Sequence, residues 1–213
     1  MPYYEQDTFE TYTKSMILTI DLLLAWGATY KKISAGETIF TEGGNCCFYH
    51  QLVSGHIKWL NINDNGKEFI QTIIEPGDSF GELPLFDDQP YAATAIAMDD
   101  CIIIRLHKPV FLQLLKESPD LHFAFSKLLA EKVRFKLLLL KTISLEEPDK
   151  CISTLLDYLK KNNKHICSGC SQVKLTRQQI ASMTGLRVET VIRTMRTMHL
   201  NGQLRIEKGK VYC

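Results

Sequence analysis

The sequence predicts an α+β protein in three parts: a β-rich domain with a leading helix over residues 1–117, a long helix over 118–145, and a small domain of helices and a β-hairpin over 146–213. Short β-branched runs separated by turn residues, an apolar heptad pattern, and a capped pair of helices near the end support this prediction. A chain of 213 residues, 45% of them hydrophobic, is long enough for two compact domains with cores of their own.

The leading helix is expected within the apolar segment from Met16 to Trp26. Thr19 and Asp21 interrupt this segment, and it is too short to cross a bilayer. We therefore expect an amphipathic helix that packs on the following domain. The sequence shows no export signal, so we expect a cytoplasmic protein without a membrane partner.

The segment from about Ile33 to Leu106 is predicted to be all-β. Its strand-like runs are IKWLNI, EFIQTII, ATAIAM and CIIIRL. Turn signals recur about every ten residues, a spacing typical of a barrel or a double-sheet roll. The Asn65-Gly66 pair predicts a hairpin, because both residues tolerate a positive φ.

Pro109 begins a short helix, and the run Ser118-Pro119-Asp120 begins a long one that extends to about Ile143. The long helix carries an apolar seam at heptad spacing, interrupted by Lys132. The seam residues are Leu121, Phe125, Leu128, Phe135 and Leu139. Such a seam is typical of a coiled coil, and the alternative is a helix that lies across its own β domain. A break at residues 146–149 predicts a hinge before a helix over 151–159.

The last forty residues predict a helix-turn-helix. Thr176 is placed to cap a helix that ends near Met183, and Gln179 can complete a capping box with it. Gly185 follows as a turn residue. A second helix from Arg187 to about His199 has an inward stripe that consists of Val191, Met195 and Met198. The β-hairpin that follows makes the pattern that of a winged helix-turn-helix, which is a DNA-binding module.

The outer face of the second helix carries groups that recognise bases. An arginine fork such as that of Arg193 matches guanine O6 and N7, and a carboxylate such as that of Glu189 accepts from cytosine N4. The alternative is a surface ion pair within the helix. Residues 174–213 carry eight basic and two acidic side chains, a net charge of +6, so with +1 for the whole chain the first 173 residues carry −5. A basic C-terminal segment attached to an acidic remainder of the chain indicates that the C-terminal segment binds phosphate groups.

Two sets of motifs point to one family. The first set consists of TRQQIA and GLRVETVIR in the C-terminal part, and the second is GDSFGELPLF at residues 77–86. On these motifs the chain resembles the cyclic AMP receptor protein and fumarate-nitrate-reduction regulator (CRP/FNR) family of bacterial transcription factors over nearly its whole length. The resemblance implies a cyclic-nucleotide-binding-like β-roll (a double-stranded β-helix), a dimerisation helix, and a homodimer on a near-palindromic site in double-stranded DNA. It also implies RNA polymerase as a partner.

The same resemblance assigns the DNA contacts. Glu189 and Arg193 would contact bases, Arg187 and Val188 would flank them, and Ile192 could press on a thymine methyl. Arg196 lies on the same face. The residues that would hold the DNA backbone are Thr176, Arg177 and Gln178.

The effector of the roll is predicted not to be cyclic AMP. In family members that bind cyclic nucleotides, a Gly-Glu pair takes the ribose and an Arg-Ser pair takes the phosphate. Here Gly81 and Glu82, followed by Leu83, match the first pair, but Tyr91 and Ala92 in the run YAATA stand at the second. A buried phosphate without a cation is costly.

We therefore predict no cofactor, and whether another small effector is obligatory for DNA binding stays open. Lys136, which departs from the family at an adenine-contacting position, is either a partner for a different anion or a solvated lysine.

The seven cysteines offer a second kind of sensing. They are Cys46, Cys47, Cys101, Cys151, Cys167, Cys170 and Cys213. An odd number without an export signal argues against a disulfide framework, and none lies in the first 45 residues, where iron-sulfur members of the family carry their cluster.

The CSGC run at 167–170 has redox or chelate spacing, with His165 or Cys213 nearby, and turn-filling cysteines are the alternative. We predict no metal site. Haem held by His50 or His56 is a further alternative. No catalytic motif is present, so we predict no enzyme activity.

Overall fold

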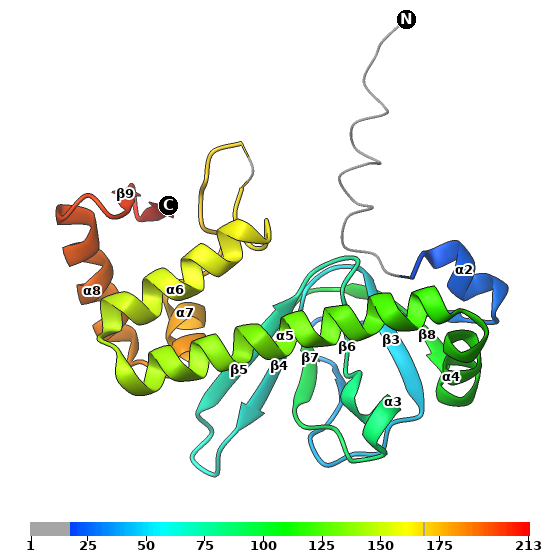
Figure 1. Cartoon of the computed structure of the whole chain (residues 1–213). Helices are drawn as coiled ribbons and strands as arrows, with labels where there is room; N and C mark the ends of the chain where they lie inside the picture. The colour runs from blue at the N-terminus through cyan, green and yellow to red at the C-terminus, as the bar shows by residue number, and fades with distance from the viewer. Residues whose placement is uncertain (1–17, 168) are drawn as a thin grey trace, which may run out of the picture. The chain divides into compact units, whose positions relative to one another are not determined.

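The computed structural model describes residues 18–167 and 169–213, which form two compact units. The first unit contains the chain up to Gly66 together with Gln71–Leu128, and the second contains Lys67–Ile70 and Leu129–Cys213. The division falls inside the long helix α5 (Pro119–Leu145), which therefore contributes residues to both units (Figure 1).

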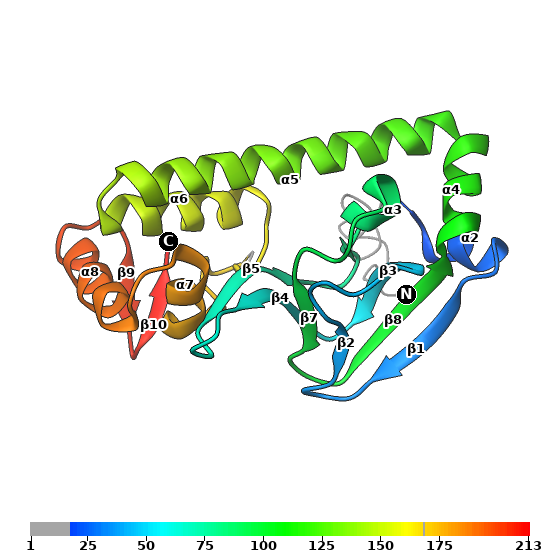
Figure 2. The ribbon, with the colours of Figure 1, turned by 90° about the horizontal axis from the view of Figure 1, so that it is seen from below.

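Two antiparallel four-stranded sheets form a β-roll, which confirms the predicted α+β fold (Figure 2). One sheet has the order β1-β8-β3-β6 and the other the order β2-β7-β4-β5. The strands are β1 Thr29–Ile33, β2 Thr38–Phe40, β3 Phe48–Ser54, β4 Ile57–Ile62, β5 Glu68–Ile74, β6 Ser79–Phe80, β7 Thr94–Ala97 and β8 Cys101–His107. Side chains alternate across each strand, so one face of each sheet supplies the core. Core residues include Ile33, Leu52, Ile57, Phe80, Ala95 and Ile103.

The hairpin predicted at Asn65-Gly66 joins β4 to β5, but its turn differs from the expectation. Only Gly66 has a positive φ, of 74°, and its backbone N–H donates to the Asn63 carbonyl over 2.8 Å. Asn65 donates its N–H to the side chain of Asn63 instead. The hairpin forms where the pair predicts it, but only the glycine uses its tolerance of positive φ, because the connection has five residues, 63–67, and not two.

Short helices flank the roll. These are α2 (Ile20–Ala25), α3 (Leu83–Asp87) and α4 (Lys108–Glu117). Thr19 caps α2, and the buried side chains of Leu18 and Leu23 hold that segment on the domain, as predicted. Met16, the start of the predicted helix, lies outside the described residues. The amide of Gln51 on β3 donates to the Leu18 carbonyl.

The predicted dimer seam on α5 packs within the chain itself. Phe125 is 1% exposed and contacts the rings of Tyr49, Phe86 and Phe111. Phe135 stacks on Tyr158 with ring centroids 3.4 Å apart, and Leu139 is also buried. Leu121 and Leu128 are half-buried on the same stripe. Much of this stripe is therefore packed within the chain, and its assignment to a dimer interface stays a prediction, because heptad spacing alone does not distinguish a second copy from the same chain.

The second unit ends in a compact helical domain with a β-hairpin. Its elements are α6 (Pro148–Lys161), α7 (Arg177–Thr184), α8 (Val188–Leu200), β9 (Arg205–Glu207) and β10 (Lys210–Tyr212). Helices α6, α7 and α8 pack on one another. Among the described residues, no helix is both long and apolar enough to span a membrane.

Candidate DNA interface

Helix α7 begins and ends where the sequence predicts. The hydroxyl of Thr176 accepts from the backbone N–H of Gln179 over 3.1 Å, and the Gln179 amide oxygen accepts from the Thr176 N–H over 2.7 Å. This capping box satisfies two of the N–H groups that a helix start leaves without partners. Gly185 ends the helix with φ 72°, a left-handed conformation that glycine adopts without steric cost.

Helix α8 is held against α7 by an apolar stripe. Val191 and Met195 are fully buried, and Met198 is nearly so. Ile180 and Met183 of α7 are buried as well. This packing fixes α8 by one side and leaves its opposite side to solvent.

The free side of α8 carries the residues predicted to contact bases. Glu189 and Arg193 are exposed and lie four residues apart, so they point in the same direction. Within residues 18–167 and 169–213, the side chains of these two residues make no hydrogen bond or ion pair. The alternative of an ion pair inside the helix is therefore not what the structure contains. Ile192 and Arg196 are exposed on the same helix, with Ile192 52% exposed, and Arg187 is exposed at its N-cap.

The residues predicted to hold the DNA backbone surround the start of α7. Thr176 and Gln178 are exposed. Arg177 is half-buried and donates to the Gly209 carbonyl of the hairpin over 3.2 Å, and partial burial lowers the pKa of its guanidinium. Arg177 thus ties α7 to the hairpin. Val188 is the first residue of α8 and is half-buried.

The β9–β10 hairpin adds basic residues that the predicted site did not include. Its two turn residues, Lys208 and Gly209, both have positive φ, of 47° and 79°, as in a two-residue hairpin turn. Lys208 and Lys210 are exposed beside this turn. The net charge of the C-terminal segment was the one signal in the sequence that pointed to them.

Two of the predicted effector residues of the roll, Gly81 and Tyr91, are packed on an aromatic cluster. Tyr91 is 4% exposed and stacks on Phe40 with ring centroids 3.8 Å apart and planes 7° apart. Burial, with a hydrogen bond to Cys46, raises the pKa of Tyr91 above its usual range. Gly81 has φ 70°, and a Cβ there would lie 2.7 Å from the Phe40 ring and 3.0 Å from the Tyr91 ring.

Glu82 is buried and accepts a hydrogen bond of 2.7 Å from the Ser79 hydroxyl. Leu83 is exposed at the start of α3, and Ala92 is exposed with its carbonyl accepting from Asn61. Glu82 therefore has a structural partner inside its own turn, without any ligand.

His50 lies in the same cluster, with its ring 5.6 Å from that of Phe40 and 5.4 Å from that of Phe80. Its Nδ1 atom is buried and has no hydrogen-bond partner in the part of the chain that the structure describes. Burial first, and then the charges of Arg105 and Lys31, lower the pKa of His50 to about 4. This histidine is therefore neutral at physiological pH.

Lys136, the remaining predicted effector residue, lies on the part of α5 that belongs to the second unit. It is half-buried. Burial and the nearby charge of Lys132 lower its pKa to about 8.

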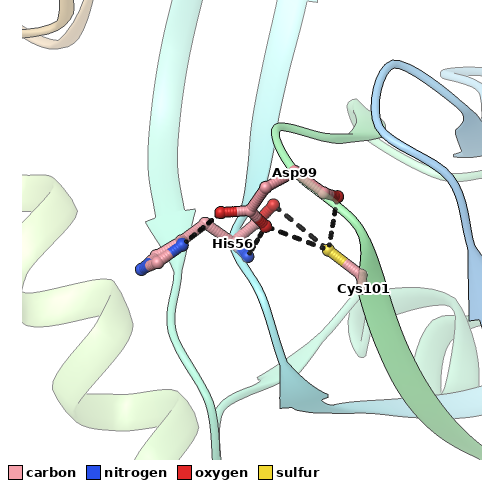
Figure 3. A network of polar contacts seen from close by, with 3 residues as sticks. All are labelled: His56, Asp99 and Cys101. Carbon is pink, nitrogen blue, oxygen red and sulfur yellow. Dashed lines mark hydrogen bonds and ion pairs between the residues drawn. The ribbon is translucent and has the colours of Figure 1, made fainter.

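Figure 3 shows a polar network between two turns of the roll. The Asp99 carboxylate accepts from the His56 backbone N–H and bonds the His56 ring, each over 2.7 Å. The Cys101 thiol donates to the backbone carbonyls of His56 and Asp99. Burial raises the pKa of Cys101, which keeps this thiol protonated. The network joins the two turns and does not form a nucleophile with its base.

Comparisons with known proteins agree with this architecture. Residues 30–118 match the model of the cyclic nucleotide-binding domain, and residues 149–212 match the Crp-like helix-turn-helix domain. The cAMP-activated global transcriptional regulator CRP of Pasteurella multocida is 28% identical over 185 residues, which cover 84% of this chain and 88% of that protein.

Two solved structures share the fold. FixK2 from Bradyrhizobium japonicum aligns with a TM-score of 0.73 and 19% identity over 87% of this chain and 91% of its own. A CooA mutant from Carboxydothermus hydrogenoformans aligns with a TM-score of 0.75 and 16% identity over 94% of this chain and 92% of its own. With the capped helix pair and the two-sheet roll, these matches show that the chain belongs to the CRP/FNR family of transcription regulators, as its motifs predicted.

Proposed function

We propose that this protein regulates transcription by binding a specific DNA sequence through the exposed face of α8. The observation that carries the proposal is the pair Glu189 and Arg193, exposed, in line and without side-chain partners in the described residues. A major groove presents guanine and cytosine edges that match a guanidinium and a carboxylate, so the pair favours a G·C base pair. Phosphate contacts come from Thr176, Arg177 and Gln178, and from the lysines of the hairpin.

The active form is a homodimer that uses the solvent-facing side of α5. Phe123, Val133, Leu137 and Leu140 are 75%, 55%, 63% and 61% exposed. Ser126 and Ala130 fill the intervening positions, so this side also has the alternating three- and four-residue spacing of a coiled coil. It lies opposite the buried stripe that contains Phe125 and Phe135. Two copies joined here would present two α8 helices to successive major-groove turns of a near-palindromic site.

A charge placed in this seam tests the dimer. We expect the double variant Leu137→Glu and Leu140→Glu to sediment as a folded monomer, because two facing carboxylates cannot be buried together. Lys116→Glu on α4, which is exposed and outside α5, serves as the matched control and should stay dimeric. A double variant that remains dimeric would place the interface elsewhere.

The roll does not use cyclic AMP in this proposal, although the Pasteurella relative is named as cAMP-activated. The YAATA run offers no cation for a phosphate, the Tyr91 ring stacks on Phe40, and Glu82 bonds Ser79. Any other ligand of the roll would act on the two α5 helices of the dimer. It would shift them between an arrangement in which the two α8 helices are spaced to bind DNA and one in which they are not. The regulator would act in the cytoplasm with RNA polymerase as its partner.

Selection of bound sequences from random duplex DNA by purified, ligand-free protein tests the proposed function. We expect a two-fold symmetric motif with half-sites about one helical turn apart. The same selection with added cyclic AMP should recover the same motif at equal yield. A folded dimer that selects no motif without ligand would contradict ligand-independent binding and favour a sensor with an obligatory effector.

A further inference from the structure

Two cysteines of the second unit, Cys167 and Cys170, lie three residues apart in the CSGC run. Ile166 pairs with Val173, and the Cys167 N–H donates to the Gln172 carbonyl over 2.9 Å. The Ser171 N–H donates back to the Cys167 carbonyl over 2.8 Å, with Ser171 at φ 56°. These bonds close the backbone around the CSGC run and bring Cys167 and Ser171, the residue after Cys170, together.

The pKa of Cys167 is lowered by its neighbours in the turn. The largest causes are hydrogen bonding with the Cys170 side chain and with the backbone of Cys170 and Gly169. These bonds, with a smaller contribution from Lys174, lower the pKa of Cys167. The other cysteines with a perturbed pKa, Cys101, Cys151 and Cys213, are shifted upward by burial. Cys167 is therefore the thiol best prepared to react, since the thiolate is the nucleophile.

The same turn is bonded to the DNA-binding hairpin. The Cys213 N–H donates to the Ser171 carbonyl over 3.2 Å, Gln172 pairs with Tyr212, and the Val173 N–H donates to the Val211 carbonyl over 2.8 Å. Strand β10 thus has the turn as a neighbour, and its other neighbour is β9. The Gly209 carbonyl at the tip of this hairpin holds Arg177 of α7. A change in the cysteine turn therefore acts directly on a strand of the hairpin.

We propose that Cys167 and Cys170 form a reversible disulfide with low-molecular-weight disulfides, and that this modification changes DNA binding through the hairpin. The regulatory part rests on the proposed function, and the disulfide itself does not. Within the described part of the chain, no three His, Cys, Asp or Glu side chains are arranged to hold a metal ion, which favours thiol exchange over chelation at this turn.

The exchange has two steps. The Cys167 thiolate attacks one sulfur of the small disulfide, which forms a mixed disulfide and releases a small thiolate that takes up a proton. The Cys170 thiol then loses its proton and attacks the Cys167 sulfur, which closes the protein disulfide and expels the second small thiol. Two protein thiols are oxidised and one small disulfide is reduced to two thiols. Excess small thiol reverses both steps.

Mass spectrometry of the full chain tests the modification. The protein is equilibrated with mixtures of reduced and oxidised glutathione, quenched with acid, alkylated and digested with trypsin. Cleavage after Lys164 and Lys174 yields the peptide 165–174, which contains Cys167 and Cys170 and no other cysteine. We expect this peptide to become lighter by two hydrogen atoms and to lose both alkyl groups as the mixture becomes oxidising. A peptide that stays doubly alkylated, or that carries glutathione on both cysteines, would overturn the proposal.

Variants identify the roles of the two thiols. In Cys170→Ser, Cys167 should retain a glutathione, because the second thiol is missing. In Cys167→Ser, the peptide should remain reduced. Cys47→Ser, at an exposed cysteine of the other unit, serves as the matched control and should leave the yield of the disulfide unchanged.

The regulatory part is measured as DNA affinity of the oxidised and reduced protein for its selected site. We expect a difference of about 5-fold or more, which is the size of a typical allosteric coupling, and no difference in Cys167→Ser, whose turn stays reduced. Equal affinity in both states would overturn the regulation while leaving the disulfide intact. Protein that binds no DNA in either state contradicts the proposed function instead, and the peptide masses remain independent of that outcome.

Discussion

The exposed face of α8 and the Gly81–Glu82 turn of the roll both carry family motifs, yet their side chains are arranged in opposite ways. On α8, Glu189 and Arg193 face solvent without partners in the described residues. In the roll, Glu82 is buried against Ser79, and Tyr91 is buried against Phe40. Unpaired polar groups on a rigid helix are available to a ligand, whereas groups already paired in a core stabilise the fold. The α8 motif therefore supports binding more directly than the roll motif does, because its side chains are left exposed.

The strongest test of the packed turn is Gly81→Ala. A methyl group there meets the Phe40 and Tyr91 rings at a φ of 70°, so we expect the free energy of unfolding to fall by about 2 to 4 kcal/mol. Gly66→Ala is the matched control, because Gly66 has φ 74° and open space around it, and it should cost only about 1 kcal/mol. Both values come from urea unfolding. Equal losses would mean that the rings move aside and that the turn has room for a ligand.

The buried histidine of the same cluster makes the stability depend on pH. In the unfolded chain His50 takes up a proton near pH 6.5, whereas in the folded chain it does so only near pH 4. The neutral His50 therefore makes its full contribution to the free energy of unfolding above pH 6.5. This contribution is lost as the pH falls toward 4, and about 2 kcal/mol of it is lost at pH 5. Unfolding at pH 7.5 and pH 5 should show this loss in the natural protein and not in His50→Phe. An equal loss in the variant would assign the pH dependence to other groups.

Arg193→Ala tests the free face of α8. Because its guanidinium has no partner among residues 18–167 and 169–213, we expect the free energy of unfolding to change by less than about 0.5 kcal/mol. Binding to the selected DNA site should weaken by about 1 to 3 kcal/mol. Fluorescence anisotropy and urea unfolding measure the two effects. A large loss of stability would show that Arg193 belongs to the fold, as Glu82 does.

Arg177→Ala should have the smallest and least specific effect. We expect binding to all DNA sequences to weaken alike by about 1 kcal/mol. The slope of log binding constant against log salt concentration should become less steep by about 1. The control is Lys32→Ala, an exposed cation on β1 of the other unit. Titrations at several salt concentrations measure both changes. A loss confined to one DNA sequence would make Arg177 a base contact.

Local signals allowed much of this architecture to be predicted from the sequence. The capping box at Thr176 and the glycine at 185 set the bounds of α7, and Pro119 sets the start of α5, because caps and helix stops depend on neighbouring residues. The DNA contacts assigned to α8 stay predictions, although the structure places them on one open face.

Features that depend on distant contacts could not be predicted. Both sides of α5 have heptad spacing, so only the packing of Phe125 and Phe135 shows which side is buried in the chain. The stacking of Tyr91 on Phe40 joins residues far apart in the sequence, and no local pattern signals it. The basic hairpin turn was visible as net charge but not as a site.

The most direct test of the central claim compares the DNA sequences selected by the natural protein and by Arg193→Ala. Our account predicts that both select a two-fold symmetric motif and that the variant loses its preference at one G·C pair in each half-site, with the other positions unchanged. An identical motif in the two selections would contradict the assignment of the α8 face as the part of the protein that recognises bases.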